Sequence, residues 1–115
     1  MIQITPSSVE QVLATEAKEL TALVDLLEES AYEAAKAEAN YKAEFAKARL
    51  SAKSSEGKKV TDAQAEDEAT VVTQGLRLDY LITQAKVNTI RERIRVSQSR
   101  IDVARTLMAS LRNMT

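Results

Sequence analysis

The sequence predicts an all-α fold, an antiparallel helical hairpin of two long amphipathic helices with a short connecting helix. Three observations lead to this prediction. The 115 residues include only two Gly and one Pro, so few positions interrupt a helix. Ala, Leu, Glu and Lys supply much of the chain, a composition typical of long helices and coiled coils. Apolar side chains recur with a seven-residue spacing in both halves of the chain, as in coiled coils.

The first helix is predicted over residues 6–53. Thr5 can cap it with Pro6 at the first helical position, or Ser7 can cap it with Glu10 three residues later. One core position of this helix holds Leu13, Leu20, Leu27, Ala34, Tyr41 and Ala48. The second core position, four residues further on, holds Ala17, Val24, Ala31, Phe45 and Ala52, with Glu38 as its polar member. A helix of this length without an internal cap favours a coiled coil.

A polar turn over residues 54–61 follows the first helix. Thr61 is predicted to cap a short helix over residues 62–74, with Gln64 completing a capping box. Gly75 either kinks or ends this segment, or the helix runs through it at a cost of about 1 kcal/mol.

A second long helix is predicted over residues 76–112, so that residues 1–115 form a single helical domain. One of its core positions holds Tyr80, Val87, Ile94, Ile101 and Met108. The other holds Leu76, Thr83, Ile90, Ser97, Ala104 and Leu111.

The chain has little aromatic mass, with one Phe, three Tyr and no Trp. A single copy would therefore bury little apolar surface, and self-association is the usual remedy for small domains. We expect a homo-oligomer held by core side chains of both long helices, namely Leu13, Leu20, Leu27, Tyr41, Phe45, Val87, Ile90, Ile94 and Ile101.

The residue types present argue against an enzyme. The chain has no Cys and no His, which removes thiolate chemistry, the commonest metal ligand and the commonest general base. The acidic run Glu66-Asp67-Glu68 would lie in the opening turns of a helix, where adjacent side chains point in different directions and negative charge suits the helix dipole. We therefore predict no catalytic residues, no metal site and no cofactor.

No apolar run approaches the length that crosses a membrane, and Met1-Ile2-Gln3-Ile4 is too short for a signal peptide. We expect no membrane partner and a cytoplasmic location, in the host cell if the chain is encoded by a phage.

Charge is divided unevenly along the chain. Residues 1–85 hold 9 basic and 15 acidic side chains, whereas residues 86–112 hold 7 basic and 2 acidic ones. In a hairpin, the acidic stretch 10–38 would lie beside this arginine-rich stretch. Most of the arginines would then form ion pairs with the acidic helix of the same or a neighbouring subunit. Contact of these arginines with phosphate groups remains the alternative.

A basic cluster lies around the end of the first helix and consists of Lys42, Lys47, Arg49, Lys53, Lys58 and Lys59. Lys42, Arg49 and Lys53 are seven and then four residues apart, so they share one helical face. In the hairpin, this cluster lies opposite residues 76–85 and away from the acidic stretch. Unpaired cations in a row suit a phosphate backbone, because each neutralised phosphate releases counterions. A solvated surface that keeps the helix soluble explains the same charges equally well.

The end of the first helix resembles a known family. The run Lys47-Ala48-Arg49-Leu50, followed by a Ser/Gly turn and a long helix that ends in Ile101-Asp102-Val103-Ala104-Arg105, resembles UvsY-type recombination mediators of tailed phages. This resemblance covers roughly residues 20–112. It implies a helical homo-oligomer that binds single-stranded DNA and helps to load a RecA-like recombinase onto strands coated by a single-strand binding protein. It also implies that Lys47 and Arg49 contact the DNA.

Two other functions stay open from the sequence. The chain could be a structural or scaffolding coiled coil of a phage particle without a role in nucleic-acid binding. It could also be a helical adaptor whose arginine-rich face binds an acidic protein. All three functions share the predicted fold.

Overall fold

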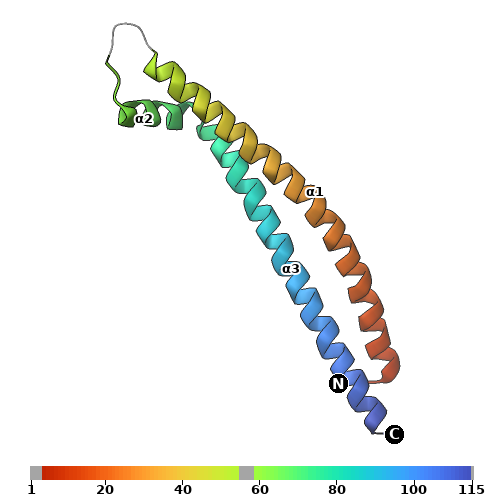
Figure 1. Cartoon of the computed structure of the whole chain (residues 1–115). Coiled ribbons are helices and arrows are strands. Elements are labelled where there is room, and N and C mark those ends of the chain that lie inside the picture. The colour runs from red at the N-terminus through yellow and green to blue at the C-terminus, as the bar shows by residue number, and fades with distance from the viewer. Residues whose placement is uncertain (1–3, 55–58, 115) are drawn as a thin grey trace. The chain divides into compact units, whose positions relative to one another are not determined.

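The computed structural model describes residues 4–54 and 59–114, and they form three α-helices and no strand (Figure 1). Helix α1 runs over Pro6–Lys53, α2 over Asp62–Val72 and α3 over Gln74–Asn113. The all-α prediction is therefore confirmed.

Helix α1 begins with a reciprocal cap between Thr5 and Ser8. The Thr5 hydroxyl accepts a hydrogen bond from the Ser8 backbone N–H at 3.1 Å, and Ser8 Oγ accepts one from the Thr5 N–H at 3.0 Å. These bonds satisfy two backbone donors near the helix start. Of the two predicted starts, the structure uses Thr5 with Pro6 and does not use Ser7 with Glu10.

Helix α2 begins with the predicted capping box, in which Thr61 and Gln64 each accept a hydrogen bond from the other's backbone N–H. The break between α2 and α3 falls at Thr73 and not at Gly75. The Thr73 hydroxyl donates a hydrogen bond to the Ala69 carbonyl at 2.7 Å, and the Thr73 carbonyl accepts one from the Arg77 N–H at 3.0 Å. Thr73 therefore lies where α2 ends and α3 begins. Helix α3 therefore includes Gly75 and starts before the predicted residue 76.

The chain divides into two compact units. The terminal unit combines Met1–Glu29 with Asn88–Thr115, and the turn unit consists of Ser30–Val87. Helices α1 and α3 each contribute a segment to both units.

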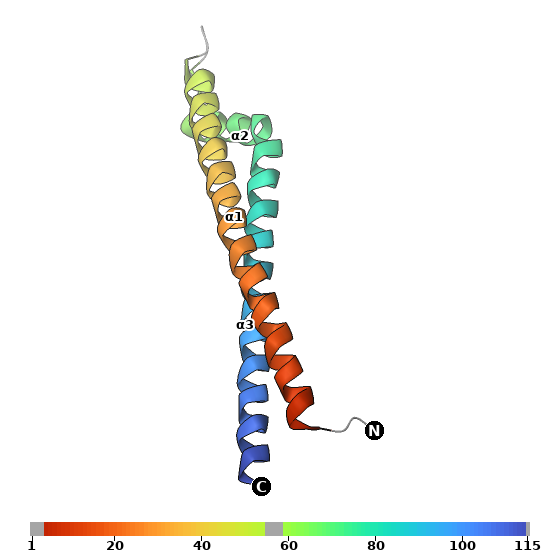
Figure 2. The same ribbon diagram turned by 90° about the vertical axis from the view of Figure 1, so that its right-hand side faces the viewer.

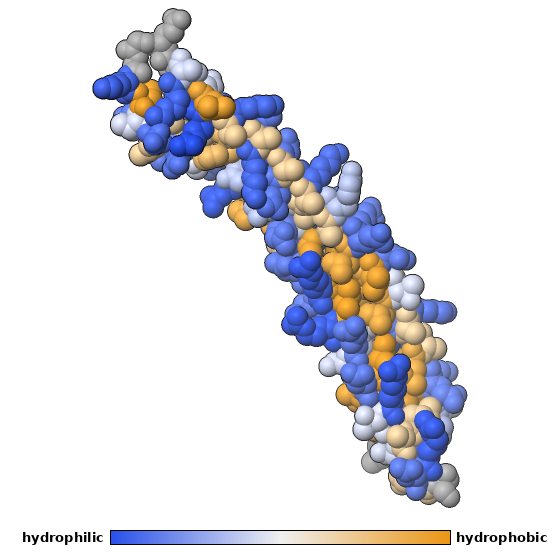
Figure 3. Space-filling model, in the orientation of Figure 1, coloured by the Kyte–Doolittle hydropathy of each residue, from blue (hydrophilic) through white to orange (hydrophobic). Residues whose placement is uncertain are grey.

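In the terminal unit, α1 and α3 pack antiparallel. Glu16 contacts Ser97 and Arg100, whereas Glu19, further along α1, contacts the earlier residue Arg93. Apolar side chains line the strip where the two helices run side by side (Figure 3). The buried apolar residues of this unit are Val9, Leu23, Ile90 and Ala104.

The register of α1 in the terminal unit corrects one sequence prediction. Leu13, Leu20 and Leu27 are half-buried, in keeping with their core position. The second core position is wrong here, because Ala17 is exposed and Val24 is 48% exposed, whereas Leu23 is only 4% exposed. In this unit, the second buried position of α1 lies three residues after Leu13 and Leu20 and holds Glu16 and Leu23. Because Glu16 is polar, the sequence did not indicate this position as part of the core.

In the turn unit, α2 lies crosswise between the end of α1 and the start of α3 (Figure 2). Tyr41 stacks on Tyr80 with ring centroids 5.9 Å apart, and Phe45 lies 6.0 Å from Tyr41. Helix α2 packs through Ala65 and Ala69, which are fully buried. The aromatic contact thus joins α1 to α3, and the buried alanines show which face of α2 is packed.

The stripe prediction for the second long helix is confirmed by burial. Every predicted core residue of α3 is buried or half-buried, including Val87, Ile90, Ile94 and Ile101. Apolar residues occupy these positions except at Thr83 and Ser97, so the stripe could be read from the sequence.

Candidate nucleic-acid interface

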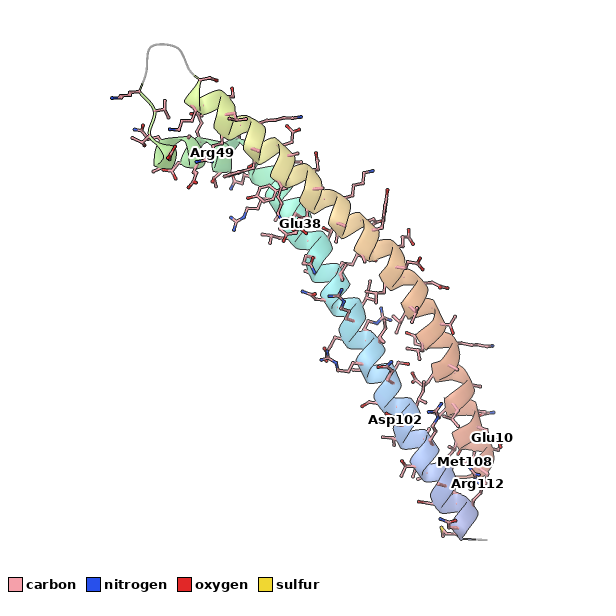
Figure 4. The ribbon with its side chains drawn as sticks, in the orientation of Figure 1. Glu10, Glu38, Arg49, Asp102, Met108 and Arg112 are labelled. Atoms are coloured by element: carbon pink, nitrogen blue, oxygen red, sulfur yellow. The ribbon has the colours of Figure 1, made fainter. Side chains whose placement is uncertain are left out.

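The described members of the basic cluster all lie in the turn unit. Four of them project from the last turns of α1, and Lys59 lies exposed just before α2. Lys58 falls outside the described residues. Arg49 extends from α1 at the side where α2 lies (Figure 4). Of these cations, Arg49 and Lys53 reach the start of α2, where both lie near Asp62.

Two of these lysines pair with glutamates of α1 itself. Lys42 Nζ lies 2.7 Å from Glu38 Oε1 one turn earlier, and Lys47 Nζ lies 3.2 Å from Glu44 Oε1. The hydrogen bond from Lys42 to Glu38, together with the charge of Glu38, raises the pKa of Lys42 above 10.5. Both lysines remain highly exposed, at 68% and 74% of their side chains.

Arg49 and Lys53 pair with α2 instead. Lys53 Nζ lies 2.6 Å from Asp62 Oδ1 and also donates to the Val60 carbonyl at 3.3 Å. Arg49 Nη2 lies 3.8 Å from Asp62 Oδ1 and 4.0 Å from Glu66 Oε1. The hydrogen bond from Lys53, followed by the charges of Lys53 and Arg49, lowers the pKa of Asp62 below 3.8. The first turns of α2 thus present carboxylates to the basic cluster.

This arrangement corrects the expectation that the cluster has no acidic neighbour. The sequence placed it opposite residues 76–85, but α2 crosses the end of α1 and brings Asp62 and Glu66 to it. The sequence analysis did not identify either carboxylate as a partner of the cluster and treated Glu66 only as part of an acidic run in the opening turns of a helix. One signal was present: Asp62 and Glu66 are four residues apart, as are Arg49 and Lys53.

The arginine-rich stretch is only partly neutralised. Arg93 Nη2 lies 3.2 Å from Glu19 Oε1, and Arg100 Nη1 lies 3.3 Å from Glu16 Oε1, as the acidic-helix prediction requires. Arg95 pairs within α3 with Glu92 at 2.9 Å. Three further cations of this stretch make no ion pair among the described residues: Lys86, Arg91 and Arg105. Within one copy, Arg93 and Arg100 thus pair with α1, and pairing of arginines with the acidic helix of a neighbouring copy stays a prediction.

The terminal unit also carries an open apolar groove of about 640 Å³ between α1 and α3. Its lining includes the apolar side chains of Ile4, Val9, Val12, Val96, Val103 and Leu107. Ile4 and Val103 are 55% and 60% exposed, although such side chains are usually covered when they cluster.

No family model matches this chain, and neither the curated proteins nor the solved structures contain a match to it. In the part of the chain that the structure describes, no three acidic side chains are grouped so that they could hold a metal ion. None of the helices, as far as they are described, has an apolar stretch long enough to cross a bilayer.

Proposed function

We propose that this chain is a homo-oligomeric single-stranded-DNA-binding protein that acts as a recombination mediator and helps to load a RecA-like recombinase. The observation that carries this proposal is the basic cluster on one end of α1. Lys42, Arg49 and Lys53 share a helical face, and their side chains are 68%, 43% and 40% exposed. The resemblance of residues 47–50 to UvsY-type mediators points in the same direction.

The ion pairs of the cluster do not prevent this function. The side chains in these pairs are 36–74% exposed, and ion pairs open to solvent contribute only about 0–1 kcal/mol each. A single strand offers a continuous row of phosphates, and each one that is neutralised releases counterions to the solvent. Phosphates can therefore replace the carboxylates at a small energetic cost.

Self-association completes the proposal. One cluster of this size would bind weakly, since non-specific sites have dissociation constants of roughly 10⁻⁴–10⁻⁶ M. Several clusters on one strand gain avidity of about 10² or more. The exposed apolar groove of the terminal unit supports assembly, because burial against other copies would remove its side chains from water. We propose that α1 and α3 form a coiled-coil-like hairpin that assembles in this way.

A scaffolding coiled coil without a nucleic-acid role is the second candidate. One observation favours it: Lys42, Lys47, Arg49 and Lys53 all have carboxylate partners in the turn unit. Under this alternative, Arg49 and Lys53 stabilise the junction between α1 and α2, Lys42 and Lys47 stabilise α1 itself, and the cluster binds no nucleic acid.

Fluorescence anisotropy with a labelled oligothymidylate across a salt series separates the two candidates. We compare the wild type with Lys47→Ala/Arg49→Ala and with Lys18→Ala/Lys36→Ala, a control that removes the same charge from α1 outside the cluster. Under the mediator proposal, the first pair weakens binding and reduces the salt slope by roughly 1.4, about 0.7 for each lost contact with the single strand. The control pair changes the slope much less.

Light scattering measures the molar mass of all three proteins and so reports their oligomeric state. The proposal requires an oligomer in every case, and a stable monomeric wild type would contradict it. Absence of binding at ~50 mM salt, where electrostatic attraction to nucleic acid is strong, would leave the scaffolding function.

A further inference from the structure

In the contact between α1 and the start of α2, two basic residues face two acidic residues that have the same spacing along the chain. Arg49 and Lys53 are one helical turn apart on α1, and Asp62 and Glu66 are one turn apart on α2. A four-residue separation corresponds to about 6 Å along a helix. Lys53 and Arg49 both approach Asp62, and Arg49 also approaches Glu66. Helix α2 therefore presents a short row of negative charges to this part of the basic cluster.

The hydrogen-bonding capacity of Arg49 is not used in this contact. Its Nη2 lies 3.8 and 4.0 Å from the two carboxylates, which is beyond hydrogen-bonding distance. Its Nε is buried and has no hydrogen-bond partner among the described residues. A phosphate can accept two parallel hydrogen bonds from a guanidinium group, so it offers Arg49 an interaction that α2 does not supply.

Helix α2 is also held weakly. Only its alanines Ala65 and Ala69 are buried, whereas its larger apolar residues Val71 and Val72 are 72% and 68% exposed. A helix of 11 residues is marginal in water without packing against other elements. The ion pairs of Asp62 and Glu66 with Arg49 and Lys53 are therefore contacts that join the start of α2 to α1.

We propose that the acidic face of α2, formed by Asp62 and Glu66, is an intramolecular competitor for the phosphate-binding site at Arg49 and Lys53. Phosphates of a single strand displace this face, so that strand binding and release of α2 from α1 occur together. This inference rests on the proposed function, and it adds a built-in regulation of the same site. Removal of the negative charges of Asp62 and Glu66 is therefore expected to strengthen DNA binding, although neither residue contacts the DNA.

The test compares Asp62→Asn/Glu66→Gln with Asp67→Asn/Glu68→Gln. Both pairs of changes remove the same two charges from the same helix, but Asp67 and Glu68 make no ion pair among the described residues. Affinity for a labelled oligothymidylate is measured by anisotropy at one salt concentration. We expect Asp62→Asn/Glu66→Gln to bind roughly five- to tenfold more tightly than the control pair, the change expected for the loss of two exposed competing interactions.

Hydrogen exchange of the α2 amides gives a second readout. In wild type, a saturating concentration of oligothymidylate is expected to increase exchange over residues 62–72, because α2 leaves α1. Equal affinities of the two variant pairs, or unchanged exchange of α2 on binding, would overturn the competition while the DNA-binding function stands. If no variant binds the oligonucleotide, the proposed function fails and the regulation fails with it.

Discussion

Ser97 Oγ donates a hydrogen bond to Glu16 Oε2 at 2.9 Å, and this bond lies within the apolar seam of the terminal unit. Ser97 is 2% exposed, and the Glu16 side chain is 12% exposed. The other carboxylate oxygen of Glu16 lies 3.3 Å from Arg100 Nη1. A charged group so close to a helix interface needs these partners, because a buried and unpaired carboxylate is costly. The pair therefore restricts α1 and α3 to one register in this unit.

Ser97→Ala is expected to lower the free energy of unfolding by about 1.5–3 kcal/mol, because Glu16 loses a donor to a charged acceptor. Ser99→Ala provides a matched control on the same helix, since Ser99 is exposed. Urea unfolding followed by circular dichroism, at one protein concentration, measures both. Equal effects of the two substitutions would show that the bond between Ser97 and Glu16 contributes nothing specific.

Asp62 makes the contact between α1 and α2 dependent on pH. Lys53 lowers the pKa of Asp62 below 3.8, so the carboxylate binds protons less readily in the folded chain than in the unfolded one. The resulting stabilisation is present above the ordinary carboxyl range and is lost as the pH falls through the lowered pKa. NMR titration of the Asp62 carboxyl carbon is expected to show its pKa moving up towards 3.8 in Lys53→Ala. A pKa of Asp62 that is the same in Lys53→Ala as in wild type would contradict the ion pair.

Gly75→Ala is expected to stabilise the protein by about 0.5–1 kcal/mol, because Ala has the higher helix propensity and restricts the unfolded chain. Gly75 lies in the first turn of α3, and a Cβ atom built there meets no atom within 4 Å. Thermal unfolding provides the measurement. A decrease in the melting temperature would indicate that another copy of the chain approaches the backbone closely at this position.

Local sequence patterns predicted the parts of the fold that depend on neighbouring residues. The Thr61 capping box was predictable because its two partners are three residues apart. The stripes of α3 were predictable because branched apolar residues recur there, as at Val87, Ile94 and Ile101. Both features arise from the chemistry of a single helix.

Features that depend on how helices meet could not be predicted in the same way. The predicted second core position of α1 contains the apolar Val24, whereas the position one residue earlier contains Glu16 and Leu23. The structure buries Leu23 instead, because Ser97 and Arg100 satisfy Glu16 across the interface. The carboxylates that reach Arg49 were missed for a related reason, since the ion pairs of Asp62 and Glu66 depend on how α2 meets α1.

Ser30 offers a test of packing in the turn unit. It is 1% exposed, and its Oγ is buried without a hydrogen-bond partner among the described residues. Burial of a hydroxyl group without a partner costs about 1–3 kcal/mol, so Ser30→Ala is expected to stabilise the chain by roughly 1 kcal/mol. Urea unfolding measures the change. A loss of stability would imply that the hydroxyl makes a hydrogen bond in solution, for instance to a water molecule.

The register of α1 is tested most directly by neighbouring residues that lie on different sides of the helix. Leu23 is 4% exposed and Val24 is 48% exposed, although both are apolar and adjacent. Leu23→Ala is expected to cost about 2–5 kcal/mol, because it leaves a cavity in the seam. Val24→Ala is expected to change the free energy of unfolding by about 0.5 kcal/mol or less if its side chain faces water in the assembled protein. Urea unfolding at two protein concentrations distinguishes a third case, because a residue covered by another copy contributes more when the oligomer is fully formed. A larger effect of Val24→Ala than of Leu23→Ala at both concentrations would contradict this register, and an effect of Val24→Ala that grows with concentration would place Val24 in the interface between copies.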